Sequence, residues 1–229
     1  ADAALQVAKA KGRDTVVAFA PEFLTSEARQ MRQRQIERTR TLSAVRALAR
    51  AVDARDPATQ RHSERVAAMT YRIARLAGWT EERAELAREA ALVHDVGKIG
   101  VPDHVLRKAG ALTDEEFALI ATHAELGATI VADVLTPEQT GWVRHHHERT
   151  DGRGYPDGLA GTDIPLFSRI ISLADNYDAM AVARPYHKAR QHQEVMDILH
   201  EGAGTKHDPE LLQAFCVIIE NSEMRTSEA

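Results

Sequence analysis

The stretch Ala91-Leu92-Val93-His94-Asp95-Val96-Gly97-Lys98-Ile99-Gly100 places a histidine, a carboxylate and a lysine directly after an apolar run. Imidazole nitrogen and carboxylate oxygen both suit hard or borderline divalent metal ions. A nearby lysine is a positive point charge of the kind that binds phosphate. A His-Asp pair alone is weak evidence for a metal site, so the interpretation depends on what accompanies it elsewhere in the chain.

Further histidines and carboxylates accompany this stretch on both sides. The protein has 11 histidines in 229 residues, and several stand with carboxylates in the middle of the chain. Such clustering is what a metal site requires, whereas scatter over the surface is the alternative. The candidates are too numerous for one ion and suit two ions: His62, His94, Asp95, His123, His146, His147 and Asp175.

Two ordered motifs resemble the signature of the HD-GYP family of metal-dependent phosphodiesterases for cyclic dinucleotides, chiefly cyclic di-GMP. The first is His94-Asp95-Val96-Gly97-Lys98, and the second is His-His-Glu-Arg-Thr-Asp-Gly-Arg-Gly-Tyr-Pro at 146–156. The likeness runs from about residue 51 to about residue 219. It implies hydrolysis of cyclic di-GMP to linear pGpG, and further to GMP as an open second step, by a hydroxide that two metal ions activate.

The resemblance implies a specific division of the ligands between two divalent ions, with iron or manganese favoured. One ion would bind His62, His94 and Asp175, and the other would bind His123, His146 and His147. Asp95 would bridge the two ions. The donors are nitrogen and oxygen without a thiolate, which argues against a structural zinc site.

The resemblance also implies residues that act on the substrate. Asp95 and Lys98 would be catalytic, with Lys98 stabilising charge on phosphate oxygens. Arg184 stands where the family carries a phosphate-contacting arginine, and Tyr155 lies in the Gly-Tyr-Pro loop, so both are expected to bind substrate with Lys98. A surface salt bridge is the alternative for Lys98 and Arg184.

The neighbours of the histidine cluster are expected to play smaller parts. Glu148 and Asp151 are candidates for orienting the histidines through hydrogen bonds. His145 has no matching role in the family and is expected to be an ordinary helical or surface histidine.

Two positions depart from the family pattern. Some members hold a third metal with a glutamate where this chain has Ala58, so a site for two metals is expected. The family commonly has arginine or lysine where this chain has His187, which Lys188 follows. The second departure weakens the expectation for substrate affinity and leaves the metal site unaffected.

Helical patterns dominate the chain after residue 26 and predict an all-α fold, with several helices around one core. A long N-terminal helix would precede a multi-helix HD-domain bundle, with the Gly-Tyr-Pro loop and further helices at its C-terminal end. Residues 151–161 contain four glycines and a proline and are expected to form a loop. The expected helices begin and end near 26–55, 57–77, 81–93, 114–135 with a break before His123, 137–147, 164–180, 191–201 and 209–220.

The N-terminal segment 1–22 resembles the end of a GGDEF domain, with a helix over 1–13 and a strand over 14–19. A local appendage is the alternative, and no cyclase activity is expected because the GGDEF active-site loop is missing. Residues 23–55 form a helical linker, for which a homodimer through the helix 26–55 and a solvated connector are equally open. The HD-GYP domain would span 56–222, with a disordered tail at 223–229.

Composition excludes several functions. The formal net charge of −5 offers no overall basic face for long nucleic acid. The sequence has no apolar stretch of membrane-spanning length and no signal-peptide pattern, which favours a cytoplasmic protein. The single cysteine, Cys216, cannot form an internal disulfide and is expected to be buried.

Two alternatives to a cyclic dinucleotide phosphodiesterase remain open at this point. One is a non-catalytic signalling module that binds a nucleotide or a partner protein; the GGDEF-like segment makes a GGDEF domain an expected partner. The other is an HD phosphohydrolase that acts on a different nucleotide. The complete ligand set disfavours the first alternative, and the Gly-Tyr-Pro loop disfavours the second.

Overall fold

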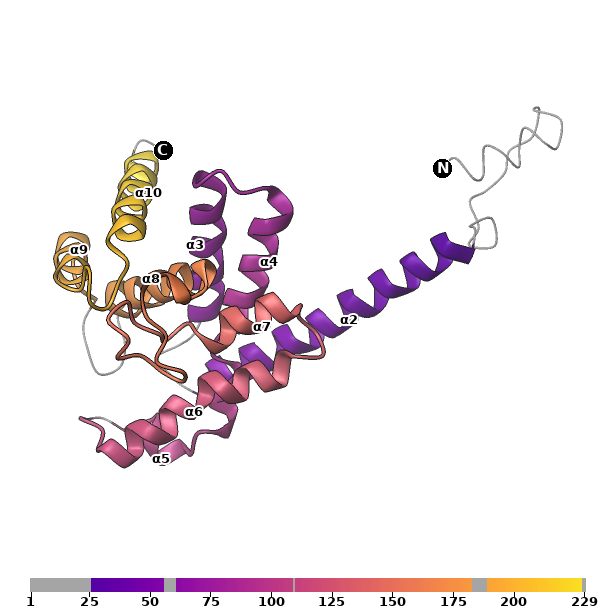
Figure 1. Ribbon diagram of the computed structural model, residues 1–229, viewed down its shortest axis with the longest axis horizontal. Helices are drawn as coiled ribbons and strands as arrows, with labels where there is room; N and C mark the ends of the chain where they lie inside the picture. The colour runs from indigo at the N-terminus through magenta and orange to yellow at the C-terminus, as the bar shows by residue number, and fades with distance from the viewer. Residues whose placement is uncertain (1–25, 56–60, 109, 183–188, 228–229) are drawn as a thin grey trace. The chain divides into compact units, whose positions relative to one another are not determined.

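The computed structural model describes residues 26–55, 61–108, 110–182 and 189–227, and it is helical without any strand in these residues (Figure 1). The expected all-α fold is therefore confirmed. The helices, including two short 3-10 turns labelled η, are α2 (Ser26–Arg55), α3 (His62–Leu76), α4 (Glu81–Leu92), η2 (Val96–Gly100), α5 (Asp103–Leu106), α6 (Asp114–Val131), α7 (Pro137–Arg144), η3 (Gly161–Asp163), α8 (Leu166–Ala181), α9 (His192–Glu201) and α10 (Pro209–Ser227).

The chain forms two units, Ala1–Ala44 and Val45–Ala229. The described part of the first unit is the N-terminal portion of α2, where Met31 is exposed. The GGDEF-like segment and its strand at 14–19 lie outside the described residues. The domain limits expected from the sequence remain predictions.

The second unit is built around α3, which packs against α4 and α8, while α7 also contacts α4 and α8 (Figure 1). Phe167 of α8 is buried between two indole rings, with ring centroids 5.1 Å from Trp79 and 4.6 Å from Trp142. Burial of such large aromatic groups contributes most to a helical core of this size. This core fixes α3, α7 and α8, which carry three parts of the candidate site.

Helix α6 is continuous, so the expected break before His123 is wrong. Its start is fixed by a capping box, in which Thr113 and Glu116 exchange hydrogen bonds with each other's backbone N–H. No glycine or proline precedes His123 in this helix to interrupt it. Gly127, one turn later, is tolerated because it lets α6 approach η2 closely.

Two other helix ends differ from those expected. Helix α7 has a second capping box, from Thr136 and Gln139, and it ends at Arg144, so the three following histidines lie in a turn rather than in the helix. Helix α10 runs to Ser227 because no glycine or proline follows Glu220 to end it. The disordered tail expected at 223–229 stays a prediction, like the other domain limits. Cys216 is buried, as expected.

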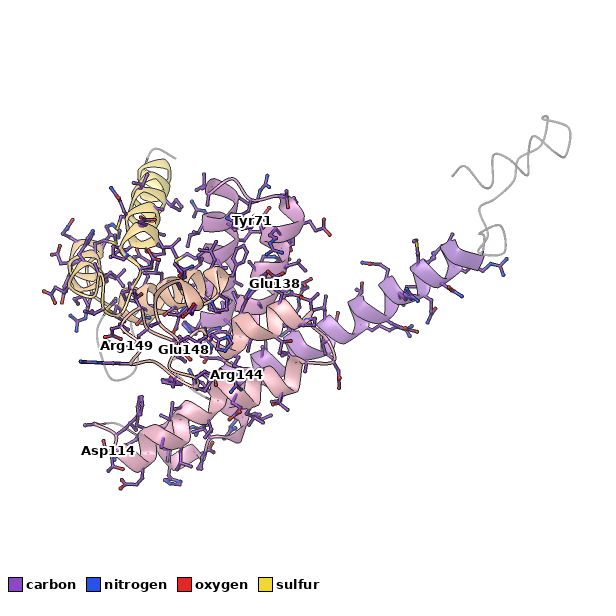
Figure 2. All side chains as sticks on the ribbon, in the orientation of Figure 1. Tyr71, Asp114, Glu138, Arg144, Glu148 and Arg149 are labelled. Carbon is purple, nitrogen blue, oxygen red and sulfur yellow. The ribbon has the colours of Figure 1, made fainter. Side chains whose placement is uncertain are left out.

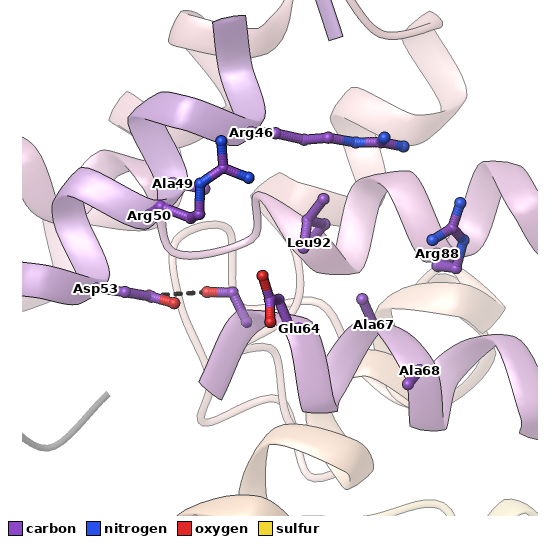
Figure 3. Close-up of a pocket in the computed structure, with 10 residues that line it drawn as sticks. Arg46, Ala49, Arg50, Asp53, Glu64, Ala67, Ala68, Arg88 and Leu92 are labelled. Carbon is purple, nitrogen blue, oxygen red and sulfur yellow. Dashed lines mark hydrogen bonds between the residues drawn. The ribbon is translucent and has the colours of Figure 1, made fainter. Parts of the chain in front are cut away.

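The last turns of α2 form hydrogen bonds with residues that follow the ligand candidates His62 and Asp95 in the chain. Ser63 donates a hydrogen bond of 2.9 Å to Asp53, drawn as the dashed line in the α2–α3–α4 groove of Figure 3. Arg55 donates to the carbonyl oxygens of Ile99 at 2.9 Å and Val101 at 3.1 Å. These bonds connect α2 to the start of α3 and to η2.

Among the described helices, none combines the length and the apolar character needed to span a lipid bilayer.

Candidate metal centre

The structure brings together all seven ligand candidates from five separate parts of the second unit. His62 opens α3, His94 and Asp95 form the turn between α4 and η2, and His123 lies in the middle of α6. The remaining three come from the turn after α7 and from α8: His146, His147 and Asp175.

The ligand atoms form two groups that share one carboxylate. One group contains His62, His94 and Asp95, and the other contains Asp95, His123, His146 and His147; within each group the ligand atoms lie within 4.8 Å of one another. Asp175 adjoins the first group, with Oδ1 3.1 Å from Nε2 of His62. Asp95 is thus the residue that the two groups of ligand atoms have in common, and the division of the ligands between two ions stays a prediction.

The two carboxylate oxygens of Asp95 face different histidines. Oδ1 lies 3.3 Å from Nε2 of His123, and Oδ2 lies 3.4 Å from Nε2 of His94. Nζ of Lys98 is 2.6 Å from Oδ2, one helical turn along η2. Burial alone would raise the pKa of Asp95, but Lys98 and the surrounding histidines hold it well below its ordinary value. Asp95 is therefore a buried anion that faces both ligand groups.

Three histidines are held in the tautomer that suits metal binding. Nδ1 of His94, His123 and His146 lies 2.6–2.7 Å from the carbonyl oxygen three residues earlier in the chain. A carbonyl oxygen can only accept, so Nδ1 must carry the proton and donate it. Each neutral ring then presents the lone pair of Nε2 to the centre of the cluster.

The geometry of these Nε2 atoms fits a bound cation. Nε2 of His123 and Nε2 of His146 are only 3.3 Å apart, and both carry lone pairs when Nδ1 is protonated. Nε2 of His94 is fully buried and has no hydrogen-bond partner among the described residues. Converging lone pairs and an unpaired buried nitrogen are costly without a cation, and a metal ion relieves both. The donor set and its geometry therefore fit divalent metal ions.

Burial and mutual proximity keep the second group of histidines neutral. Burial lowers the pKa of His147 to about 3, with a further contribution from His123. The pKa of His146 is well below its ordinary value for the same reasons, with His147 as its nearest electrostatic cause. Burial also lowers the pKa of His123. Neutral imidazole is the form that binds metal, so these three rings are prepared as ligands.

His62 is held differently, by carboxylates on both ring nitrogens. Nδ1 lies 2.6 Å from Asp178, while Nε2 faces Asp175. Burial would lower the pKa of His62, but the hydrogen bonds to Asp175 and Asp178 raise it to about 9. A positive charge is thus favoured between His62 and Asp175, and a metal ion can replace the proton there.

Asp178 is a functional residue that the motifs did not indicate. It is buried one turn after Asp175 on α8, and it accepts hydrogen bonds from His62 and from Nε and Nη2 of Arg65 at 2.5 and 2.9 Å. Its spacing of three residues from Asp175 places both carboxylates on the same helix face, which was the available signal. Asp178 orients His62 and increases its basicity.

Replacing Asp178 with asparagine is expected to lower metal affinity by about 10- to 100-fold, because His62 loses its anionic partner and Arg65 loses its counter-ion. Competition of the loaded protein with a chelator measures this affinity. Asp163→Asn, at an exposed carboxylate in η3, is the matched control. Unchanged metal retention in Asp178→Asn would show that the His62–Asp178 bond has no part in binding.

The loop after α7 is fixed by Glu148 rather than by the histidines. Glu148 is buried and accepts hydrogen bonds from the backbone N–H of Asp157 at 2.7 Å and of Leu159 at 3.0 Å (Figure 2). Asp151 instead pairs with Arg149 at 2.7 Å. The expectation that Glu148 and Asp151 orient the histidines is thus replaced by a role in shaping the loop.

The close packing of this loop places Tyr155 against the metal-ligand cluster. A Cβ on Gly154 would lie 2.4 Å from the backbone N of Arg149, so only glycine fits there. The ring of Tyr155 is 4.9 Å from that of His147, centroid to centroid. His145 lies at the edge of the site, 2.9 Å from Asp157, as a half-buried histidine outside both ligand groups.

A pocket of about 340 Å³ opens beside this cluster. Two aromatic side chains in it are in contact, with Phe117 5.7 Å from Tyr155 between ring centroids. Phe117 is half exposed and was not singled out as a substrate residue. Arg184 and the departures at Ala58 and His187 lie outside the described residues. The pocket is lined by Phe117, His147, Glu148, Arg149, Arg153, Gly154, Tyr155, Ser172, Asn176 and Lys206.

Comparison with known proteins finds relatives that are named as phosphodiesterases of cyclic dinucleotides. The chain is 40% identical over 164 residues to a cyclic di-GMP phosphodiesterase of Thermotoga maritima, covering 70% of this chain and 45% of that protein. It is also 40% identical over 172 residues to 3'3'-cGAMP-specific phosphodiesterase 3 of Vibrio cholerae, covering 74% of this chain and 37% of that protein. The chain thus spans less than half the length of these curated relatives.

A solved structure supports the same fold. The crystal structure of a cyclic GMP-AMP specific phosphodiesterase of Vibrio cholerae superposes with a TM-score of 0.60 at 18% identity, covering 79% of this chain and 49% of that one. At this identity the likeness concerns the fold alone.

The family model described as "HD domain" matches residues 46–211, which include all seven ligand candidates. The resemblance that the two motifs indicated is confirmed by this match and by the relatives. This chain belongs to the HD domain family, in its HD-GYP branch.

Proposed function

We propose that this chain is a metal-dependent phosphodiesterase that hydrolyses cyclic di-GMP to linear pGpG, and further to GMP. The convergence of the His123 and His146 Nε2 atoms at 3.3 Å, beside the Asp95 carboxylate, is the observation that carries the proposal. The names of the relatives support cyclic dinucleotides as the substrate class, with 3'3'-cGAMP as the second candidate.

Two divalent ions, iron or manganese, are proposed to occupy the two ligand groups that share Asp95. When bound, such ions supply Lewis acidity that polarises a phosphodiester and lowers the pKa of water. The nitrogen and oxygen donors permit either metal.

The protein's own residues would position the substrate and balance its charge. Lys98, half-buried beside Asp95, would hold a non-bridging phosphate oxygen. Tyr155 would offer a ring face to a base, and Arg184 is proposed to contact phosphate. The buried surroundings of Asp95 exclude bulk water and would strengthen the contact between Lys98 and phosphate.

The test is metal analysis of anaerobically purified protein, followed by turnover of cyclic di-GMP, 3'3'-cGAMP and cyclic di-AMP with iron and with manganese. The proposal expects close to two ions per chain and metal-dependent release of a linear dinucleotide. Binding of cyclic di-GMP without turnover by fully loaded protein would favour the signalling-module alternative. Turnover of mononucleotides alone would favour another nucleotide phosphohydrolase.

A homodimer through α2, association with a GGDEF domain and a cytoplasmic location remain part of this proposal. The first two follow from the helical pattern of 26–55 and from the GGDEF-like segment 1–22. Equilibrium sedimentation of the chain, compared with a variant that begins at residue 45, tests the dimer.

A further inference from the structure

The pocket beside the metal centre is lined in part by a cation, Lys206, that the proposed chemistry does not use. Lys206 lies in the turn between α9 and α10, far in sequence from both motifs. It lines the same pocket as His147 and Tyr155. Its ammonium group donates a hydrogen bond of 2.6 Å to Oδ1 of Asn176, the residue after Asp175.

The partner of Lys206 is neutral, which leaves its charge available. Among the described residues, no carboxylate forms an ion pair with Lys206, whereas Arg149 in the same pocket is taken by Asp151 at 2.7 Å. Burial lowers the pKa of Lys206, and the negative charge of Asp175 opposes this shift. A neutral amide fixes the direction of an ammonium group without cancelling its charge. Lys206 therefore presents an oriented positive charge to the pocket.

The two lysines of the site are arranged differently. Lys98 is held by Asp95 at the metal-ligand cluster, while Lys206 is held by Asn176 on the wall formed by α8 and the α9–α10 turn. A cyclic dinucleotide carries two phosphodiesters on opposite sides of its ring, and only one can lie at the metals at a time. The other phosphodiester needs a separate counter-charge within the same pocket.

We propose that Lys206, oriented by Asn176, binds the phosphodiester that is not being cleaved and so selects cyclic dinucleotides over substrates with a single phosphate. The inference rests on the proposed function of the site. Exposed Arg153 lines the same pocket and is a second cation on the loop side. Lys206 is a substrate-binding residue in this proposal and takes no part in proton transfer.

The experiment compares Lys206→Gln with wild-type protein, both loaded with manganese. For cyclic di-GMP, KM is expected to rise about ten-fold with kcat little changed, equivalent to about 1.4 kcal/mol of lost binding. For bis(p-nitrophenyl) phosphate, which has one phosphodiester, KM is expected to change less than about two-fold. Lys206→Arg should restore most of the affinity because it keeps the charge.

A binding measurement separates affinity from turnover. Calorimetric affinity for a phosphorothioate analogue of cyclic di-GMP is expected to fall by a similar factor in Lys206→Gln. Arg72→Gln, at an exposed cation of α3 outside the pocket, is the matched control and should bind normally.

The outcomes distinguish this inference from the proposed function. If wild-type protein hydrolyses cyclic di-GMP and Lys206→Gln does so with an unchanged KM, the inference is wrong and the function stands. If the KM change is confined to guanine-containing substrates and absent for cyclic di-AMP, Lys206 reads a base and the inference is also wrong. If wild-type protein hydrolyses only bis(p-nitrophenyl) phosphate, both the proposed function and the inference are wrong.

Discussion

Replacing Asp95 with asparagine is expected to lower phosphodiester turnover by about a thousand-fold or more and to reduce the metal content of the protein. Both oxygens of this carboxylate are used, one toward His123 and the other toward His94 and Lys98. An amide removes the negative charge and replaces one acceptor with a donor that faces the cluster. A loss of about 4 kcal/mol, within the range for breaking a buried charge pair, corresponds to a thousand-fold in rate.

The measurement is turnover of cyclic di-GMP together with ion count per chain, at matched protein concentration. Asp133→Asn is the control, because Asp133 is an exposed carboxylate just beyond α6. Circular dichroism should show that Asp95→Asn keeps its helices, since Asp95 is not part of the aromatic core that Phe167 forms with Trp79 and Trp142. Wild-type turnover and full metal content in Asp95→Asn would contradict the bridging role of Asp95.

Replacing Gly97 with alanine is expected to destabilise the fold by about 3 kcal/mol or more and to displace metal ligands. A Cβ at this position would lie 1.9 Å from the carbonyl oxygen of His123 and 2.5 Å from the backbone N of Gly127. Both contacts are to backbone, so relief requires η2 and α6 to move apart. That movement separates Asp95 from His123, which now approach to 3.3 Å.

Thermal unfolding measures the loss, with Tm expected to fall by roughly 6–12 °C for a chain of this size. Gly141→Ala is the matched control, because a Cβ there meets nothing within 4 Å. Gly141 lies inside α7, where alanine favours the helix by up to about 1 kcal/mol, so its Tm should rise slightly or stay unchanged. A Tm for Gly97→Ala equal to that of wild type would show that η2 and α6 can separate at little cost.

The helices were predictable where the sequence carries local signals. Capping residues set the starts of α6 and α7, and apolar spacing indicated α3 and α8. The break expected before His123 was wrong, because no glycine or proline precedes His123 in α6 and the helix continues through Gly127, which packs against η2. The end of α10 was expected too early, near residue 220, because no glycine or proline follows Glu220 to stop the helix.

The sequence by itself indicated which side chains could serve as metal ligands, because the two ordered motifs contain His94, Asp95, His146 and His147. The family resemblance that these motifs carry adds His62, His123 and Asp175. The sequence also determined that the fold is helical, since helix periodicity and caps are local properties of the chain. The tertiary structure alone decided that the Nε2 atoms of His123 and His146 converge beside Asp95, that Asp178 holds His62, and that Lys206 reaches the pocket. These features depend on distances between helices far apart in the chain, which arise only when the core packs and which side-chain identity does not encode.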